Sequence, residues 1–456
     1  MKRTLAEYAR SCGGELLGAD RAYTGVSTDT RTLKAGELFV ALRGPRFNAN
    51  DFVAAAETAG AAGAVVDTRV DRPLSQILVR DTQQALTRAA AAWRAQFSIP
   101  IVGVAGSNGK TTVKEMTASI LERRGPTLST RGNLNNHIGV PLTLYRLEPT
   151  HRNAVIEIGA NHPGEVAALV AFTRPTVGLI TNAGAEHLEG FGSIEGVARA
   201  EGEMVEGLEP SASAVINADD AFADLWRGMT RAKVSTFGVE KPADFSAQDL
   251  HISIDGNGFA THFTLRAPQG SIPVTLHLAG RHNVLNALCA AAAASAAGAT
   301  LDDVRAGLAT MRPVPGRLQF KTAPSGAWIV DDSYNANPSS MKAGIEVLAA
   351  VDARRWLVMG DMGELGDYAE ESHGDIGRFA RNHRIDRLFA TGKLSALAVE
   401  AFGSGGEWFA DTEALARAVN AELTREVCVL VKGSRSNRLE RVVEALVGSP
   451  SEHGTH

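Results

Sequence analysis

Short blocks of hydrophobic residues alternate with polar turns along the chain and divide it into three parts. In the first part, up to residue 82, strand-length apolar runs cover residues 36–44, 63–67 and 76–80. Residues 54–62 supply a helical pattern between two of these runs. Short strands with an intervening helix predict a small α/β domain.

The second part, residues 83–314, is expected to contain a parallel sheet. A helical segment at residues 82–97 leads into an apolar strand at 101–104, and further strand-length runs follow at 154–158, 177–181 and 214–217. Helical segments separate these runs, and such alternation favours a parallel sheet covered on both faces. Between residues 249 and 278 the pattern becomes alternating, which predicts a small antiparallel insertion with a turn at 255–258.

The third part, residues 315–456, again alternates between strands and helices. Its buried runs lie at residues 328–331, 355–359, 387–390 and 427–431. This pattern predicts a smaller Rossmann-like domain. The expected fold is therefore α/β with three domains, in which a phosphate-loop ATPase-type sheet lies between two others.

Composition narrows the possible partners and compartment. The chain of 456 residues is 44% hydrophobic and 21% charged, with a formal charge of −5, so we expect no general attraction to nucleic acid. Cys12, Cys289 and Cys428 are widely spaced and are expected to be small core residues in a reducing compartment. The N-terminus lacks a signal-peptide pattern, and the alanine-rich run at 285–299 predicts a buried helix without a membrane span. We therefore expect a cytoplasmic protein.

A phosphate loop follows the strand at residues 101–104. Gly106 and Gly109 allow the backbone N–H groups to approach phosphate oxygens, Lys110 can reach the β- and γ-phosphates, and the Thr111 hydroxyl can bind Mg²⁺. The alternative is a glycine turn with a solvated lysine. We expect bound nucleoside triphosphate at Gly106, Ser107, Asn108, Gly109, Lys110, Thr111 and Thr112.

Two later strands end in polar side chains that would lie beside this loop. Glu157 ends one strand, and Asn182 and His187 follow the next. A carboxylate at the carboxyl edge of a parallel sheet, beside a phosphate loop, suggests a Mg²⁺ ligand. The alternatives are a structural salt bridge for Glu157 and a structural role for His187.

Residues 106–112, Glu157, and the pair Asn182 and His187 resemble the Mur ligases, the ATP-dependent amino-acid ligases of peptidoglycan synthesis. The resemblance covers essentially the whole chain. It is greatest to the branch that joins D-alanyl-D-alanine to UDP-N-acetylmuramoyl-tripeptide. The segments that select this branch are residues 133–142, 157–165, 331–338 and 431–435.

The resemblance implies a division of labour among the domains. The first domain would hold the uridine diphosphate part of the substrate through Ser27, Thr28, Asp29 and Arg31, although Asp29 and Arg31 could also be a surface ion pair. The second domain would bind ATP, with Asn283 on the adenine side or acting as a helix cap.

The third domain would complete the site. Arg317 and Asp332 match positions that reach ATP. The implied substrate contacts are Asn135, Asn136, Tyr334, Asn335 and Asn337. Lys432, Ser434 and Arg435 would close over the substrate or form a solvated basic turn.

The resemblance also implies a mechanism. The tripeptide carboxylate attacks the γ-phosphate of ATP, and the amine of D-Ala-D-Ala attacks the resulting acyl phosphate. Lys110, Glu157, His187 and Arg317 would be the catalytic residues, and Thr111, Glu157 and His187 would hold Mg²⁺. The third domain would close before chemistry to exclude water. We expect a monomer acting on small molecules.

One position departs from the family pattern. Mur ligases usually carry a lysine, carbamylated by CO₂, where this chain has Glu201. A carboxylate is also an anionic oxygen ligand, so we hypothesise that Glu201 supplies the metal-site charge directly or through water. The alternative is a surface helix residue.

Two other classes of protein compete with this interpretation. One is another ligase of the superfamily, such as a folylpolyglutamate synthase or a Mur ligase that adds a single amino acid. The other is a phosphate-loop switch or transport ATPase. Residues 27–31 argue against the folate enzyme, residues 334–338 argue against other Mur members, and a switch would not explain separate uridine-type and ligase-type signatures.

Overall fold

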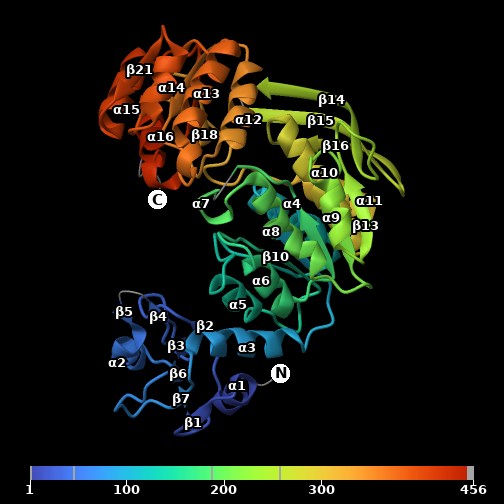
Figure 1. Cartoon of the computed structure of the whole chain (residues 1–456), viewed down its shortest axis with the longest axis vertical. Helices are drawn as coiled ribbons and strands as arrows, with labels where there is room; N and C mark the ends of the chain where they lie inside the picture. The colour runs from blue at the N-terminus through green and yellow to red at the C-terminus, as the bar shows by residue number, and fades with distance from the viewer. Residues whose placement is uncertain (1–2, 45–46, 186–187, 256–257, 449–456) are drawn as a thin grey trace, which may run out of the picture.

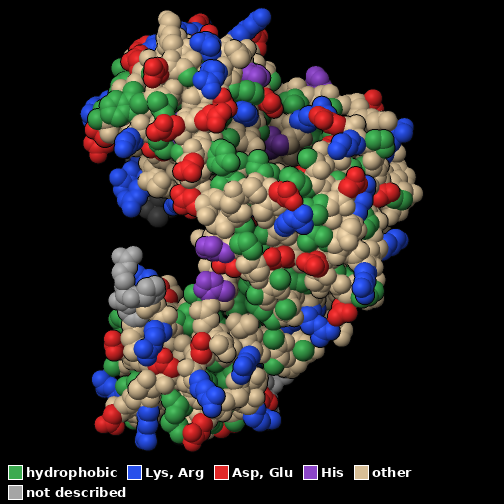
Figure 2. Space-filling model, viewed as in Figure 1, with side chains coloured by type: hydrophobic (Ala, Val, Ile, Leu, Met, Phe, Trp, Pro, Cys, Tyr) green, Lys and Arg blue, Asp and Glu red, His purple; other side chains and the backbone are tan. Residues whose placement is uncertain are grey.

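The computed structural model describes residues 3–44, 47–185, 188–255 and 258–448, and its three domains, each built on a sheet of five or six strands, follow one another along the long axis (Figure 1). The N-terminal, central and C-terminal domains follow one another in chain order. The surface is hollowed between the two outer domains on the left of Figure 2. On this face Lys and Arg side chains are interspersed with Asp and Glu.

The N-terminal domain is a five-stranded sheet in the order β1-β7-β6-β3-β2, with β1 antiparallel to its neighbour and the other pairs parallel. Its strands are β1 (Glu15–Leu17), β2 (Val26–Ser27), β3 (Leu38–Val40), β6 (Gly63–Val66) and β7 (Gln76–Leu78). The short strands β4 (Arg43–Gly44) and β5 (Phe47–Asn48) pair antiparallel, and the helices are α1 (Leu5–Cys12), η1 (Ala49–Phe52) and α2 (Val53–Thr58). The helix expected over residues 54–62 ends earlier, at Thr58, because the chain turns at Gly60, where φ is +82°.

The central sheet is fully parallel, as the sequence predicts, and its strand order is β13-β12-β11-β8-β10-β9. Its strands are β8 (Ile101–Ala105), β9 (Thr127–Ser129), β10 (Asn153–Glu157), β11 (Val177–Ile180), β12 (Ser213–Asn217) and β13 (Lys233–Phe237). Alternate side chains of β8 face opposite cores, Ile101 and Ala105 on one side and Val102 and Val104 on the other.

Helices cover both faces of this sheet. One core includes side chains of α3 (Thr82–Arg94), α5 (Gly139–Leu144), α6 (Glu165–Thr173), α8 (Ile194–Glu206) and α9 (Ala223–Met229). The opposite core includes α4 (Lys110–Leu121), α10 (Arg281–Ala296) and α11 (Leu301–Ala309). The short α7 (Leu188–Phe191) and η2 (Glu122–Arg124) complete the domain. The alanine-rich α10 is buried, as predicted, and among the described residues no helix is both long and apolar enough to cross a bilayer.

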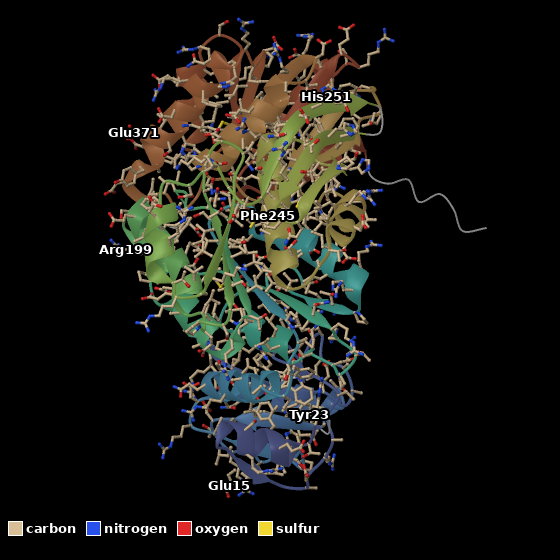
Figure 3. The ribbon with its side chains drawn as sticks, turned by 90° about the vertical axis from the view of Figure 1, so that its right-hand side faces the viewer. Glu15, Tyr23, Arg199, Phe245, His251 and Glu371 are labelled. Carbon is tan, nitrogen blue, oxygen red and sulfur yellow. The ribbon has the colours of Figure 1, made fainter. Side chains whose placement is uncertain are left out.

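The predicted antiparallel pairing of the insertion is confirmed, whereas residues 256–257 of its predicted turn lie outside the described residues. The insertion consists of β14 (Ser246–Asp255), β15 (Gly258–Ala267) and β16 (Gly270–Leu276), in that order. The insertion reaches from the central domain to the C-terminal domain, where Figures 1 and 3 show β14 and the labelled His251. Phe259 at its end is buried within the C-terminal core and meets the ring of Phe320 at a centroid distance of 6.0 Å.

The C-terminal domain has the expected Rossmann-like arrangement, with strand order β17-β18-β22-β19-β20-β21 and only the β17 pairing antiparallel. The strands are β17 (Gln319–Thr322), β18 (Trp328–Asp332), β19 (Arg354–Met359), β20 (Arg387–Thr391), β21 (Gly406–Phe409) and β22 (Val427–Lys432). One face packs α12 (Pro338–Ala349), α13 (Ala369–Asn382) and α14 (Ser395–Phe402). The other packs α15 (Thr412–Glu422) and α16 (Glu440–Val447), and short turns form η3 (Gly366–Tyr368) and η4 (Arg435–Asn437). Cys12, Cys289 and Cys428 are buried in the domain cores, as expected.

A buried histidine fixes the loop that follows β19. His373 is fully buried, its Nε2 accepts the Met362 backbone N–H at 2.9 Å, and its Nδ1 lies 2.6 Å from the Ala369 carbonyl oxygen. Burial lowers the pKa of His373 below its ordinary value. The folded protein therefore holds this imidazole neutral, with Nε2 as the acceptor.

We predict that His373 makes the fold less stable in acid. Below the ordinary histidine pKa, near 6.5, the unfolded chain takes up a proton that the folded chain excludes, so unfolding becomes easier as the pH falls. The loss can reach roughly 1.4 kcal/mol per pH unit while only the unfolded state is protonated. Urea unfolding at pH 7 and pH 5 should show a smaller pH dependence in His373→Gln than in the wild type or in the exposed control His277→Gln. An equal pH dependence in all three proteins would contradict this assignment.

Candidate active site

The phosphate loop connects β8 to α4 at the carboxyl edge of the central sheet. Gly106 and Gly109 have φ angles of +120° and +83°, which favour glycine. A β-carbon at Gly106 would lie 2.1 Å from the Thr181 hydroxyl oxygen, and one at Gly109 would lie 2.5 Å from Asn286 Oδ1. Both glycines are therefore required by close approach as well as by backbone conformation.

Asn182, which follows the end of β11 at Ile180, holds the loop from beside the neighbouring strand. Its Oδ1 accepts the Asn108 N–H at 3.0 Å, and its Nδ2 donates to the Asn108 carbonyl at 3.0 Å. The Asn182 carbonyl also accepts the Ser107 N–H at 2.9 Å. The backbone of Asn108 is thus tied in both directions to the edge of the sheet.

Glu201 supports the same loop from α8. Its carboxylate is buried, with the residue 2% exposed, and Oε2 accepts the Gly106 N–H at 2.6 Å. The alternative of a surface helix residue is therefore wrong. Glu201 places a negative charge directly beneath the first glycine of the loop.

Lys110 folds back over the loop at the start of α4. Its ammonium group donates to the Ser107 carbonyl at 3.1 Å and also contacts the Gly106 carbonyl. This arrangement keeps the charge beside the backbone that would surround a phosphate. The N-terminus of α4 adds the positive end of its dipole at the same point.

Glu157 ends β10, and only one of its two carboxylate oxygens has a hydrogen-bond partner. The residue is 3% exposed, and Oε1 accepts the Asn135 side-chain N–H at 2.9 Å. Oε2 is buried without a hydrogen-bond partner, and Glu157 forms no ion pair within the described part of the chain. The salt-bridge alternative thus finds no support, whereas an oxygen acceptor lacking a donor fits a cation ligand.

Of the other two expected metal ligands, only Thr111 is among the described residues. Thr111 Oγ1 accepts a hydrogen bond from Arg317, and His187 lies outside the described residues. No group of three His, Cys, Asp or Glu side chains arranged for a metal occurs among the residues that are described. The metal set therefore stays a prediction, supported at Glu157.

The C-terminal domain contributes Arg317 to the phosphate loop. Arg317 Nη2 donates to Thr111 Oγ1 at 3.2 Å, and its guanidinium lies 4.5 Å from the centre of the Tyr334 ring. Asp332 fixes the segment by accepting the Leu318 N–H at 3.1 Å and by pairing with Lys432 at 2.6 Å. The buried ion pair thus positions the arginine.

Both domains line one cavity of about 500 Å³ around the loop. The predicted residues that it brings together are Ser107, Asn108, Gly109, Lys110, Thr111, Thr112, Asn135, Glu157, Asn283, Arg317, Asp332, Tyr334, Asn335 and Asn337. Lys432 also lines the cavity, whereas Asn136 lies outside its lining, where its Oδ1 accepts the Ile138 and Gly139 N–H groups before α5. Gly106, at the start of the loop, and Glu201, which accepts its N–H, lie outside the cavity lining.

The start of α10 forms another wall of the cavity. The helix begins at Arg281 with Gly280 as its N-cap, so the interpretation of Asn283 as the cap is wrong. Asn283 instead donates to the Ala279 carbonyl at 2.7 Å and accepts from Asn286 at 3.1 Å. Burial lowers the pKa of the adjacent His282 to about 4, so this wall carries a neutral imidazole.

The expected uridine-binding residues lie apart from this cavity, in the N-terminal domain. Ser27 ends β2, and Asp29 and Arg31 follow on the surface. Arg31 forms an ion pair with Asp29 at 2.7 Å and holds the pKa of that carboxyl at about 2 through hydrogen bonding. Asp29 and Arg31 therefore form the surface ion pair that was the alternative to a binding role. The role of Ser27, Thr28, Asp29 and Arg31 in binding the uridine diphosphate group stays a prediction.

Two residues of the site escaped assignment from the sequence. Asn182 was recognisable as an amide at a strand end, but no pattern showed that it holds the loop. Ser339 lines the cavity on α12 and accepts the Asn108 side-chain N–H at 3.0 Å. A serine in the first turn of a helix carries no sequence signal for a contact more than two hundred residues away.

The comparisons with known proteins agree with this architecture. The Mur ligase middle domain matches residues 104–294, and the Mur ligase, glutamate ligase domain matches residues 316–435. The UDP-N-acetylmuramoyl-tripeptide–D-alanyl-D-alanine ligase of Escherichia coli (strain K12) is 46% identical over 456 aligned residues, which cover 99% of this chain and 99% of that protein.

Solved structures give the same result. A crystal structure of MurF from Acinetobacter baumannii is 34% identical with a TM-score of 0.92, covering 98% of this chain and 99% of the other. MurF ligase from Thermotoga maritima, solved in complex with ADP, is 28% identical with a TM-score of 0.82, covering 92% and 96%. With two matched domains and a relative of this identity aligned along its full length, the chain belongs to the Mur ligase family.

Proposed function

We propose that this protein is the ATP-dependent ligase that joins D-alanyl-D-alanine to the C-terminal carboxylate of UDP-N-acetylmuramoyl-tripeptide, releasing ADP and phosphate. The observation that carries the proposal is one cavity in which the phosphate loop meets Arg317 of the C-terminal domain. The full-length similarity to a ligase with this named activity selects the substrates.

The first chemical problem is the approach of two anions. A carboxylate oxygen must attack the γ-phosphorus of ATP while ADP departs, and charge repulsion opposes that approach. Lys110 and Arg317 stand at opposite ends of the loop segment that would hold the phosphates. Their charges neutralise the phosphate oxygens and stabilise the charge that develops during transfer.

Residues of the central domain fit a magnesium ion beside these phosphates. Glu157, with its buried acceptor oxygen, and Thr111 would hold it, and His187 is proposed to join them. When bound, Mg²⁺ supplies positive charge to the phosphate oxygens. Asn135 orients the Glu157 carboxylate by donating to its other oxygen.

The second step requires protection from water. The acyl phosphate reacts with the free amine of D-Ala-D-Ala, so a C–N bond forms, phosphate leaves and the amine loses a proton to solvent. Water would compete for the same carbon. Side chains of both domains surround the cavity, and closure of the C-terminal domain over it would limit that side reaction.

The remaining assignments concern substrate recognition. Ser27, Thr28, Asp29 and Arg31 are proposed to hold the uridine diphosphate group, with Asn136 and Asn135 nearer the peptide. Tyr334 and Asn335 line the cavity on the C-terminal side, where the dipeptide would enter. The protein is proposed to act in the cytoplasm as a monomer on small molecules.

Glu201 is proposed to replace the carbamylated lysine of related enzymes. Its buried carboxylate lies against the phosphate loop and carries the same sign of charge as a carbamate. Unlike a carbamate, a carboxylate needs no CO₂ to form.

The proposed activity predicts a strict requirement for two substrates. Wild-type protein should release ADP from ATP only when UDP-N-acetylmuramoyl-tripeptide and D-Ala-D-Ala are both present. Lys110→Met should lower kcat at least about a hundredfold, because it removes a charge beside the transferred phosphate. A coupled ADP assay over a matrix of nucleotide peptides and amines makes the measurement. ADP release without either substrate would indicate a switch ATPase, and release with folate and glutamate would indicate the rival ligase.

The Glu201 proposal predicts independence from bicarbonate. Activity of the wild type should be unchanged when CO₂ is removed, and Glu201→Gln, which keeps a hydrogen-bond acceptor but loses the charge, should weaken Mg²⁺-dependent ADP binding about tenfold or more. Glu201→Lys should show a carbamate signal by NMR with ¹³C-bicarbonate, and the exposed control Glu206→Gln should behave as the wild type. Strong activation of the wild type by bicarbonate, or unaltered binding in Glu201→Gln, would contradict the proposal.

A further inference from the structure

The first turn of α12 closes a ring of hydrogen bonds with the phosphate loop. Asn337 Nδ2 donates to Asn108 Oδ1 at 2.8 Å, and Asn108 Nδ2 donates to Ser339 Oγ at 3.0 Å. Ser339 Oγ in turn donates to Asn337 Oδ1 at 3.0 Å. Each member both donates and accepts, so the ring is a complete polar contact between two domains.

The residues of the ring are fixed in both domains by secondary structure. On the central side, Asn182 ties the Asn108 backbone to the end of β11. On the C-terminal side, Asn337 is the N-cap of α12, and its Oδ1 also accepts the Ser340 N–H at 2.9 Å. A displacement of α12 relative to the central sheet would therefore break the ring, because Asn337 and Ser339 move with α12 while Asn108 stays tied to Asn182.

A second contact lies on the other side of Gly109 and Lys110. There Arg317, from the C-terminal domain, donates to Thr111 Oγ1. Together with the packing of Phe259 in the C-terminal core, the attachments at Asn108 and Thr111 fix the orientation of the domain over the loop. The ring is thus placed to set the position of the Arg317 guanidinium.

We propose that Asn337 and Ser339 are positioning residues that seat the C-terminal domain on the phosphate loop and align Arg317 with the phosphates. This inference rests on the proposed function for its kinetic consequence but not for its structural one. It gives Asn337 a different role from the substrate contact that the sequence suggested, because its amide is engaged by Asn108, Ser339 and Ser340.

The ring also links the loop to domain docking in both directions. A ligand that holds the loop in its observed conformation favours docking, and docking favours that conformation by the same factor. Loss of one neutral hydrogen bond changes such an equilibrium by about three- to tenfold.

The test uses Ser339, which is exposed and can be changed without disturbing a core. Ser339→Ala should lower kcat about three- to tenfold with little change in the KM for D-Ala-D-Ala, because the ring contacts the loop and not the dipeptide. Ser339→Thr keeps the hydroxyl and should restore kcat. Ser404→Ala, an exposed serine elsewhere in the same domain, is the matched control.

X-ray scattering of the substrate-free proteins supplies an independent readout. Ser339→Ala should have a larger radius of gyration than the wild type, Ser339→Thr and Ser404→Ala, because its docked population is smaller. Equal scattering in all four proteins would overturn the proposal, as would a kcat loss in Ser339→Ala that Ser339→Thr fails to reverse. Failure of the wild type to use D-Ala-D-Ala would refute the proposed function and leave the scattering test intact.

Discussion

The two hydrogen bonds between the Asn182 side chain and the Asn108 backbone are the interaction on which the rest of the site depends. A loop that binds phosphates must keep one conformation. The chain meets this need by tying the Asn108 backbone to Asn182, which follows β11, and by letting Gly106 approach Thr181 closely. Lys110, Arg317 and the α12 contact are all placed relative to this fixed segment.

The two joints between domains differ in chemistry. At the N-terminal joint Tyr8 stacks on Tyr145 with ring centres 5.9 Å apart, and Arg3 lies 4.4 Å from the centre of the Trp93 ring while donating to the Leu147 carbonyl. Opening this joint would expose the buried aromatic rings to water, which costs free energy. At the phosphate loop the joint to the C-terminal domain is a polar ring, whose hydrogen bonds can exchange with water. Phe259 of the insertion also packs in the C-terminal core, so the polar contacts at the phosphate loop are the part of this joint that can form and break during turnover.

The sequence predicted the features that rest on local pattern. Apolar runs located the buried strands of the central and C-terminal sheets, and glycine spacing located the phosphate loop. Strand ends also placed Glu157 beside that loop, because parallel strands share a carboxyl edge.

The features that depend on tertiary contact escaped prediction. Short edge strands such as β9 and β21 lack long apolar runs, since one side of each has no partner strand. The burial of Glu201 could not be read from a helix sequence, because it depends on a loop some ninety-five residues away. Phe259 likewise joins a core formed by residues that follow it in another domain.

The most direct test of the account is the binding of ADP to Asn182→Ala, measured by titration calorimetry alongside the wild type. If Asn182 organises the loop for phosphates, losing its two hydrogen bonds to the Asn108 backbone should raise the Kd at least about tenfold, while thermal unfolding stays cooperative. An unchanged Kd in a folded Asn182→Ala protein would show that the loop needs no such support and would contradict the account.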